Sequence, residues 1–148
     1  MKPKYAVYCR ASTRNVSHQG HSIEGQKETL LAYAHKLGLS IAGIFIDIGS
    51  AKKPRTQFQK MLATIQAEKV SGILTSDISR LARNVGQMKG LVTLMEGDIL
   101  HEVRTPKETF TSASDLSLHG ALLEQYHAAL SRNTKRGMEA ARLRKLQS

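Results

Sequence analysis

Residues Tyr5–Arg10 read YAVYCR and are followed by Ala11–His21, which read ASTRNVSHQGH. The first stretch is short and apolar, which is typical of a buried strand. The second is polar and contains glycine, so we expect a long loop directly after this strand. Two more short runs, Leu39–Ile48 and Gly72–Thr75, also predict strands, and polar residues follow each of them. These three runs decide the fold class, because helical patterns separate them.

Helical patterns lie between the predicted strands. Ser22 is expected to cap a first helix, which Gly38 ends. Thr56 is expected to cap a second helix, because the apolar residues after it repeat at helical spacing. A third helix is predicted at Gly86–Glu96, and a fourth strand at Asp98–Val103. The apolar positions of the second helix are Phe58, Met61, Leu62 and Ile65.

The alternation of strands and helices predicts βαβ units. We therefore expect an α/β domain with a mainly parallel sheet of four to five strands, flanked by helices. In open sheets of this kind, functional sites form outside the carboxyl ends of the strands. Polar clusters follow three of these ends, at Arg10–Thr13, Asp47–Arg55 and Ser76–Asn84. The side chains that this arrangement places towards one rim include Ser12, Arg55 and Arg80.

The last part of the chain predicts one long helix. Arg104–Ser114 is a polar connector, after which Ser114 or Ser117 is expected to cap a helix that continues to about Lys145. Such a helix reaches roughly 40–45 Å, whereas a domain of this size is about 30 Å across, so part of it must project. Its apolar stripe needs a partner, and a second copy of the chain is the simplest one. The stripe comprises Leu118, Leu122, Tyr126, Leu130, Thr134 and Met138.

The charge of the chain favours a polyanionic partner. Its 22 Lys and Arg residues against 12 Asp and Glu residues give a net charge of +10. Half of this charge lies in Ser131–Ser148, where phosphate binding is favoured over a merely solvated helix face. The basic residues of this segment are Arg132, Lys135, Arg136, Arg142, Arg144 and Lys145.

Missing motifs disfavour several classes of function. No apolar run is long enough to span a membrane, and no glycine-rich loop for a nucleotide is present. His18 and His21 lack an obvious third ligand, so no metal or other cofactor is expected. Cys9, the only cysteine, is expected to be a small buried thiol in a reducing compartment. Metal dependence stays open at three carboxylates that could approach the same rim, namely Asp47, Asp77 and Asp98.

A serine with many arginines remains as the candidate site. A serine hydroxyl is a poor nucleophile until a base or a strong positive field stabilises its alkoxide. Arginines supply such a field, stay charged at any working pH and grip phosphate oxygens in pairs. The alternative is that the serine merely ends a strand and that the arginines are surface residues. The set that suits metal-free attack on a phosphodiester comprises Ser12, Arg10, Arg55, Arg80 and Arg83.

Six motifs occur in a fixed order along nearly the whole chain. They are YCRAST at Tyr8–Thr13, SIEGQ at Ser22–Gln26, FIDIGS at Phe45–Ser50, RTQF at Arg55–Phe58, SRLARN at Ser79–Asn84 and SRNTKRG at Ser131–Gly137. This ordered set resembles the catalytic domain of the serine recombinases, a family of resolvases, invertases and large phage-type integrases. The variant SRLARN is similar to the large-recombinase branch. The family usually has Asp where this chain has Ser79, and often an acidic residue where it has Tyr126.

This resemblance implies a site-specific recombinase that cuts and rejoins DNA. Ser12 would attack a DNA phosphodiester to form a 5′-phosphoserine, with strand exchange and religation following without metal or ATP. Arg10, Arg80 and Arg83 would hold the scissile phosphate, and Arg55 would add positive charge. The supporting residues would be Gln26, Asp47, Ser79, Asn84 and Glu124.

The resemblance also implies the partners and the organisation of the protein. Double-stranded DNA would be the substrate of a homodimer, which becomes a tetramer during strand exchange. We expect a cytoplasmic bacterial, phage or mobile-element protein with no membrane segment. Residues 1–113 would form the catalytic domain, and 114–148 a continuous helix for dimerisation and DNA contact. The chain stops where family members continue into DNA-reading domains, so we expect it to be part of a longer protein.

Two other readings of the sequence stay open. One is a non-catalytic DNA-binding or dimerisation module that retains the same fold. The other is a flavodoxin-like signalling receiver, which would need a cluster of acids for magnesium and a partner lysine. The intact Arg10, Ser12, Arg80 and Arg83 favour the recombinase over both.

Overall fold

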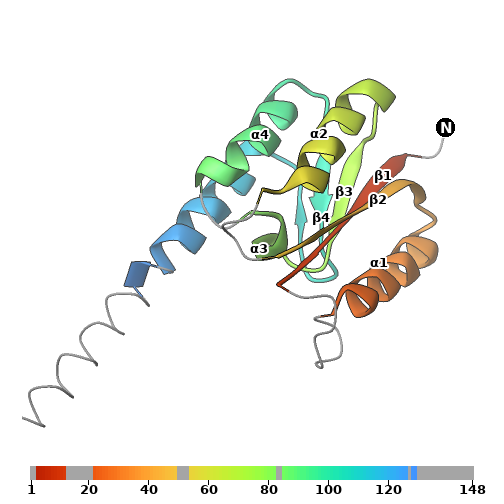
Figure 1. The fold of residues 1–148 in the computed structure, drawn as a ribbon. Helices are drawn as coiled ribbons and strands as arrows, with labels where there is room; N and C mark the ends of the chain where they lie inside the picture. Colours follow the sequence, from red (N-terminus) through yellow and green to blue (C-terminus); the bar gives the residue numbers. More distant parts are fainter. Residues whose placement is uncertain (1–2, 13–21, 50–53, 83–84, 127, 130–148) are drawn as a thin grey trace, which may run out of the picture.

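The structure, a computed structural model, describes residues 3–12, 22–49, 54–82, 85–126 and 128–129. A five-stranded sheet forms its middle layer (Figure 1). The strands are β1 (Lys4–Ala11), β2 (Ser40–Ile48), β3 (Gly72–Thr75), β4 (Glu102–Arg104) and β5 (Thr109–Phe110). Their order is β2-β1-β3-β4-β5; β2, β1, β3 and β4 are parallel, and β5 is antiparallel to β4. The predicted α/β class with a mainly parallel sheet is confirmed.

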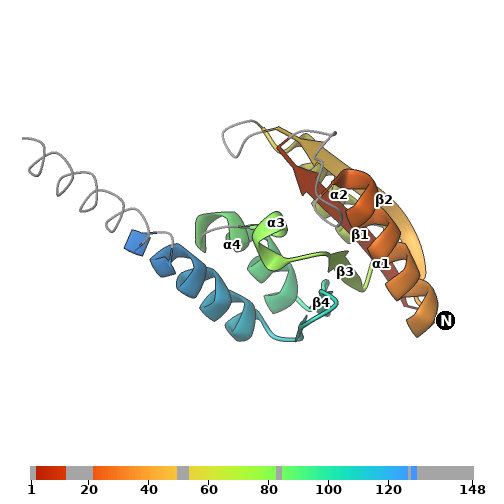
Figure 2. The ribbon, with the colours of Figure 1, turned by 90° about the horizontal axis from the view of Figure 1, so that it is seen from below.

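Helices cover both faces of the sheet (Figures 1 and 2). On one face lies α1, and on the other lie α2 and α4, while the short α3 follows the end of β3. A further helix occupies residues 113–126 and is called the C-terminal helix below. The bounds of the others are α1 (Ile23–Leu37), α2 (Thr56–Glu68), α3 (Ile78–Leu81) and α4 (Val85–Glu96).

Strand β1 is buried on both faces, which explains its nearly continuous apolar sequence. Its side chains alternate between two cores. Val7 and Cys9 pack with Ile23 and Leu30 on the α1 side, whereas Tyr8 packs on the side of α2 and α4. The strand therefore lies at the centre of the molecule, and the backbone that leaves its carboxyl end starts from a rigid position.

Local signals fix both ends of α1 as predicted. The Oγ of Ser22 accepts a hydrogen bond from the backbone N–H of Gly25 at 3.0 Å. Gly38 adopts a left-handed conformation with φ of 69° and donates its N–H to the carbonyl of Ala34. Both predictions for this helix are confirmed.

The N-terminus of α2 is capped from another element, so the prediction of Thr56 as its cap is wrong. Thr56 is the first helical residue, and Arg55, at the N-cap position, makes no side-chain capping bond. Instead, the carboxylate of Asp47, at the end of β2, accepts the N–H groups of Gln57 and Phe58, both at 3.0 Å. A negative charge at this position also interacts favourably with the helix dipole.

The elements after β3 differ in detail from the sequence prediction. The expected polar turn Ser76–Asn84 contains the short helix α3, which Asp77 caps by accepting the N–H of Ser79 at 2.8 Å. The fourth strand begins at Glu102 rather than at Asp98. Asp98 has φ of 57°, which belongs to a left-handed turn and is incompatible with an extended strand.

The predicted connector Arg104–Ser114 also contains structure. Residues Thr109–Phe110 form β5, whose antiparallel pairing with β4 closes that edge of the sheet. The C-terminal helix begins at residue 113, and the Oγ of Ser112 accepts the N–H of Asp115 at 3.1 Å. Ser112 is therefore the capping residue, and the prediction of Ser114 or Ser117 is wrong.

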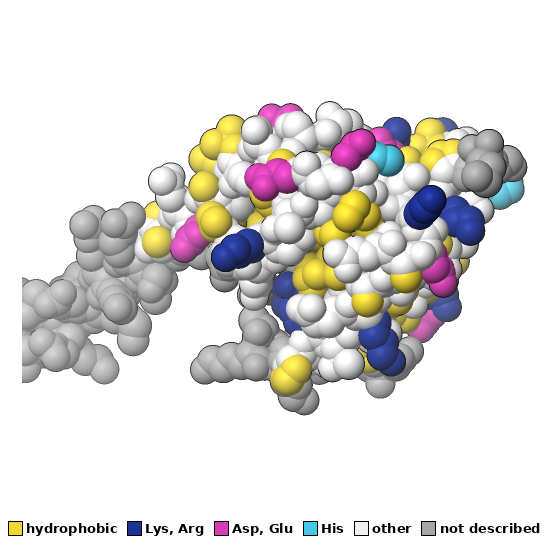
Figure 3. All heavy atoms as spheres, turned by 90° about the horizontal axis from the view of Figure 1, so that it is seen from above, with side chains coloured by type: hydrophobic (Ala, Val, Ile, Leu, Met, Phe, Trp, Pro, Cys, Tyr) yellow, Lys and Arg dark blue, Asp and Glu magenta, His cyan; other side chains and the backbone are white. Residues whose placement is uncertain are grey.

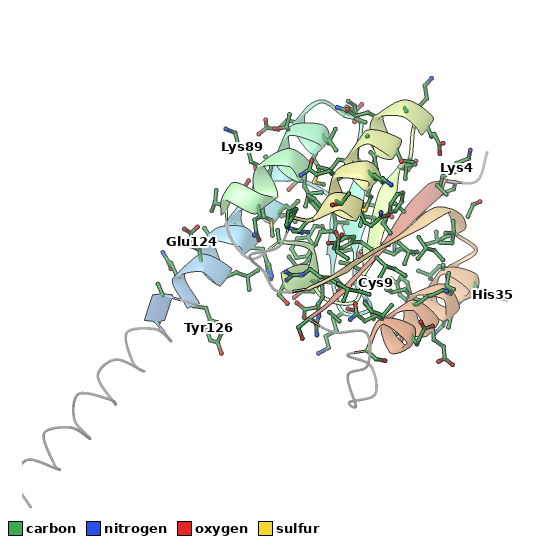
Figure 4. The ribbon with its side chains drawn as sticks, in the orientation of Figure 1. Lys4, Cys9, His35, Lys89, Glu124 and Tyr126 are labelled. Atoms are coloured by element: carbon green, nitrogen blue, oxygen red, sulfur yellow. The ribbon has the colours of Figure 1, made fainter. Side chains whose placement is uncertain are left out.

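The described part of the C-terminal helix presents the predicted apolar stripe to solvent. Leu118, Leu122 and Tyr126 are 60%, 56% and 61% exposed. Tyr126 points away from the body of the domain (Figure 4). The continuation of the helix to Lys145, with Leu130, Thr134 and Met138, lies outside the described residues. The division into residues 1–113 and 114–148 stays a prediction. Within the ranges that the structure describes, no helix is long and apolar enough to cross a membrane.

Candidate active site

The candidate site lies at the carboxyl ends of β1 and β3. Strand β1 sits between β2 and β3, and the helices that follow β1 and β2 cover opposite faces of the sheet. Such a reversal is a topological switch point, where an open parallel sheet leaves a crevice for a ligand. Ser12 comes directly after β1, and α3 follows β3 closely, so both border this point (Figure 2).

Ser12 is exposed, whereas Arg10 is buried to 5% exposure. We expected the two side chains on the same side if the extended conformation continued. It does not, because β1 ends at Ala11 and Ser12 lies in a bend. The carbonyl of Ala11 accepts the N–H of Gly49 at 3.0 Å, which ties the backbone next to Ser12 to the end of β2. The candidate nucleophile is thus presented to solvent from a fixed backbone.

Gln26 holds the backbone of Arg10 from the first turns of α1. Its side-chain Oε1 accepts the Arg10 N–H at 3.2 Å, and its Nε2 donates to the Arg10 carbonyl at 3.0 Å. Gln26 is only 1% exposed, so both bonds are shielded from competing water. This amide fixes the strand two residues before Ser12, which fits the supporting role that the resemblance implies.

Arg10 and Arg80 join β1 to α3 in both directions. The Arg10 Nη2 donates to the carbonyl of Ser79 at 3.0 Å, and the Arg80 Nη1 donates to the carbonyl of Arg10 at 3.2 Å. Each of these two guanidinium groups therefore donates a hydrogen bond to a backbone carbonyl of the other element. Guanidinium groups placed in this way can attract and orient an anion at the rim.

Arg55 reaches α3 from the N-cap of α2. It donates a hydrogen bond to the carbonyl of Leu81, the last residue of α3. Its guanidinium carbon lies 3.9 Å from the ring centroid of Phe58 and 5.4 Å from that of Tyr8. Its Nε donates to the Tyr8 hydroxyl at 3.4 Å. The structure thus brings Arg55 to the same short helix as Arg10 and Arg80.

Tyr8 lies beneath these arginines and is completely buried. Its hydroxyl donates to the Asp47 Oδ2 at 2.7 Å. Burial raises the pKa of Tyr8 to about 12, an effect that Arg55 opposes and Asp47 reinforces. The hydroxyl is therefore neutral at ordinary pH and can donate to the carboxylate while accepting from the guanidinium.

Some of the predicted site residues lie elsewhere or outside the described residues. Glu124 does not join the arginines through any described hydrogen bond to them. It lies on the C-terminal helix, where its Oε2 accepts the N–H of Val85, the first residue of α4, at 3.3 Å (Figure 4). The predicted residues that fall outside the described ranges are Arg83, Asn84, Arg132, Lys135, Arg136, Arg142, Arg144 and Lys145.

The sequence did not place three further residues around the arginines. Asp77 caps α3, Phe58 supports Arg55, and Tyr8 links Asp47 with Arg55. Strand alternation carried a usable signal for Tyr8, since residues two apart share a face and Tyr8 precedes Arg10 by two. Phe58 is three residues after Arg55 at the start of α2, so helical spacing also carried a signal for that contact, whereas the contacts of Arg55 with Tyr8 and Leu81 depend on how α2 packs.

Arginine side chains gather around α3, whereas the opposite end of the molecule is mixed in charge. Arg80 extends from α3, and Arg10 and Arg55 donate to carbonyls of this helix, while Ser12 is exposed directly after β1. The face seen in Figure 3, at the other ends of α2 and α4, has basic and acidic side chains interspersed. Among the described residues, no three His, Cys, Asp or Glu side chains lie close enough together to hold a metal ion.

These features define a class of protein: an α/β domain with an exposed serine and several arginines at the switch point of a parallel sheet. The family description "Resolvase, N terminal domain" matches residues 5–146, and the chain belongs to this family of serine recombinase catalytic domains. A resolvase family site-specific recombinase from Streptococcus pneumoniae is 26% identical, with a TM-score of 0.62 over 99% of this chain and 100% of that one.

Two further solved structures are similar in fold. The N-terminal catalytic domain of TP901-1 integrase is 24% identical, with a TM-score of 0.60 over 92% of this chain and 98% of that one. The C-terminal catalytic domain of ISC1926 TnpA, an IS607-like serine recombinase, is 23% identical, with a TM-score of 0.56 over 71% and 70%. No curated protein matches the chain.

Proposed function

We propose that Ser12 is the nucleophile of a DNA recombination reaction. Its Oγ attacks the phosphorus of a DNA phosphodiester, a new P–Oγ bond forms, and the bond from phosphorus to the 3′ oxygen breaks. The hydroxyl proton ends on the departing 3′ oxygen, which leaves a free 3′ hydroxyl and a 5′-phosphoserine. The observation that carries this proposal is the exposed side chain of Ser12, two residues after Arg10. The Arg80 guanidinium donates a hydrogen bond to the Arg10 carbonyl.

The arginines are assigned to the phosphate. During phosphoryl transfer, negative charge spreads over the non-bridging oxygens, and fixed cations stabilise that charge. Arg10 and Arg80 are held by backbone carbonyls, so they need little reorganisation when the phosphate arrives. Arg83 is assigned to the same task from the sequence motif, and Arg55 adds positive charge beside α3.

The replacement of the usual Asp by Ser79 is compatible with this arrangement. Arg10 bonds to the backbone carbonyl of residue 79, so the contact does not depend on the side chain there. The bond that α3 needs at its N-terminus comes from Asp77. We therefore expect the phosphate-holding geometry to be the same with Ser79 as with Asp.

Religation is the reverse of cleavage. A 3′ hydroxyl of the exchanged strand attacks the phosphoserine, and Ser12 leaves with its proton restored. The phosphodiester is exchanged for another phosphodiester, so no ATP is consumed. Double-stranded DNA is the proposed substrate, and the S. pneumoniae relative is itself described as a site-specific recombinase. We assign contact with the DNA phosphate backbone to the segment Ser131–Ser148, which has a net charge of +5.

A dimer that becomes a tetramer during strand exchange is proposed as the working assembly. Support comes from the apolar stripe of the C-terminal helix, where Leu118, Leu122 and Tyr126 are exposed. Isolated apolar side chains on a surface are common, but three at helical spacing along one helix favour a helical partner.

A covalent-capture assay tests the proposal. The complete protein is incubated with a pool of supercoiled plasmids that carry random inserts from the source genome, so that the recognition site need not be known. Denaturing gels then report protein linked to 5′ DNA ends. We expect linkage with the wild-type protein and none with Ser12→Ala. Linkage that survives in Ser12→Ala refutes the nucleophile assignment, and a wild-type protein that only binds DNA supports the non-catalytic module.

A further inference from the structure

The Tyr8 hydroxyl occupies a shared position between two charged groups. It donates to the Asp47 Oδ2 at 2.7 Å and accepts from the Arg55 Nε at 3.4 Å. The Tyr8 ring meets the Phe58 ring edge-on, with 5.5 Å between centroids and an interplanar angle of 73°. Tyr8 is completely buried, whereas Asp47 and Arg55 are partly exposed, so the hydroxyl is shielded from water mainly on the Tyr8 side.

Several surrounding groups fix the orientation of the Arg55 side chain. The Phe58 ring lies against the guanidinium plane, the Leu81 carbonyl accepts from Nη2, and the Tyr8 hydroxyl accepts from Nε. Long arginine side chains otherwise populate many rotamers, and ordering one costs side-chain entropy. Contacts from β1, α2 and α3 together select one of these rotamers.

Asp47 fixes the backbone position from which the Arg55 side chain extends. By accepting the N–H groups of Gln57 and Phe58, it fixes the first turn of α2 against β2, and Arg55 immediately precedes this turn. The same carboxylate is the acceptor for Tyr8. One hydroxyl therefore connects the group that fixes the backbone of Arg55 with the Nε of its side chain.

We propose that Tyr8 is a positioning residue, whose hydroxyl fixes the guanidinium of Arg55 beside α3 for use at the phosphate. This inference rests on the proposed function for its catalytic consequence. A phenol suits the position because it can donate one hydrogen bond and accept another at the same oxygen. Phenylalanine keeps the ring contacts with Phe58 and Arg55 but offers neither bond.

The chain contains a matched control in Tyr5, on the same strand. Tyr5 is also buried, at 4% exposure, and its hydroxyl also donates to a carboxylate, that of Glu102. It faces the opposite core, and the Nε of Arg104 donates to the same Glu102 carboxylate. Tyr5→Phe therefore removes a comparable buried hydrogen bond without touching the candidate site.

Nuclear magnetic resonance of the chain itself tests the positioning. The arginine Nε–H signals are recorded for the wild type, Tyr8→Phe and Tyr5→Phe, and the Arg55 signal is assigned by its loss in Arg55→Lys. We expect Tyr8→Phe to shift the Arg55 signal and to raise its exchange with water at least about tenfold, because the acceptor is gone. Tyr5→Phe should leave that signal unchanged. An Arg55 signal that is the same in Tyr8→Phe and wild type overturns the inference, whatever the protein does to DNA.

The rate of covalent capture tests the consequence. We expect Tyr8→Phe to slow the formation of linked DNA about tenfold or more, since a misplaced group loses much of its effect. Tyr5→Phe should react within about twofold of wild type. Tyr8→Phe combined with Arg55→Ala should be no slower than Arg55→Ala alone, because the two act as one unit. If the rate losses of Tyr8→Phe and Arg55→Ala multiply in the double variant, the inference is overturned. If the wild type never links to DNA, the proposed function is refuted, and the resonance measurement alone decides whether Tyr8 positions Arg55.

Discussion

At the scale of single residues, burial raises the pKa of three side chains of β1 and keeps them protonated. Burial raises the pKa of the Cys9 thiol to about 11, and that of Tyr5 and of Tyr8 to about 12. Cys9 is completely buried in the core beneath α1 (Figure 4), so the expectation of a small buried thiol is confirmed. A thiol in this state is a poor nucleophile, which leaves Ser12 as the exposed candidate at the end of the same strand.

The reactivity of Cys9 follows from this pKa. Because only the thiolate is alkylated, iodoacetamide at pH 8.5 should label the folded chain at least about tenfold more slowly than the urea-unfolded chain. Mass spectrometry over a time course measures both rates, and the absence of any other cysteine makes the reading unambiguous. Equal labelling rates in the two states contradict a buried Cys9.

The same shifts predict how stability depends on pH. The ordinary pKa values, 9.0 for Cys9 and 10.0 for Tyr5 and Tyr8, are raised in the folded chain, so folding favours the protonated forms. Their contribution to stability is fully present below about pH 9 and is lost as the pH rises towards 12. Urea unfolding at pH 7, 9, 10 and 11 measures the free energy of unfolding, which should fall from pH 9 upwards. A flat or rising profile contradicts the burial of these groups.

At the scale of elements, the two caps of α1 and α2 show what the sequence can and cannot predict. Ser22 caps α1 through the residue three positions on, which is a local pattern that the sequence carries. Asp47 caps α2 from strand β2, about ten residues earlier in the chain, and this cap depends on how β2 and α2 pack together. Thr56 is of a residue type that often caps helices and lies at the start of α2, but it is the first helical residue and not the cap.

The other differences between prediction and structure have the same origin. The two-residue strand β5 is too short to show a periodicity and exists because it pairs with β4. The start of β4 was misplaced because Asp98, which directly precedes the apolar Ile99 and Leu100, takes a left-handed conformation. The rim itself was predictable, since parallel strands place their carboxyl ends together. The contacts of Arg55 with Tyr8 and Leu81 were not, because they depend on β1, α2 and α3 packing together.

Removal of the Asp47 cap should weaken α2 more than a change at Thr56. Asp47→Ala deletes the acceptor of two helix N–H groups and of the Tyr8 hydroxyl, which should cost about 1–3 kcal/mol of unfolding free energy. Thr56→Ala should change stability by less than about 0.5 kcal/mol, because Thr56 is exposed and makes no capping bond. Chemical denaturation of both variants measures the difference. If Thr56→Ala is the more damaging change, the assignment of the cap is wrong.

At the scale of the whole molecule, two regions differ in what they present. The sheet and its helices bring Arg10 and Arg80 together at the end of β1, directly before the exposed Ser12, while the C-terminal helix exposes apolar side chains. Glu124 connects the two regions by accepting the N–H of Val85 at the start of α4. This contact ties the described part of the C-terminal helix to the body of the domain.

Self-association through the apolar stripe is testable with a matched pair of variants. Leu122→Lys places a charge in the stripe and should weaken self-association at least about tenfold, because a lysine is costly to bury there. Ala128→Lys adds the same charge at an exposed position on roughly the opposite side of the helix and should have little effect. Sedimentation velocity over a range of concentrations measures both. A strictly monomeric wild type, or equal weakening by both variants, contradicts the proposed interface.

The proposed reaction joins the Ser12 oxygen covalently to DNA. Trapped protein–DNA complexes are digested with nuclease and trypsin, and the peptide Ala11–Arg14, which reads ASTR, is sequenced by mass spectrometry. We expect a 5′-linked nucleotide phosphate on Ser12 of this peptide. A nucleotide on Thr13 or on any other residue, or an unmodified ASTR peptide from complexes that are covalently linked, contradicts the proposed reaction.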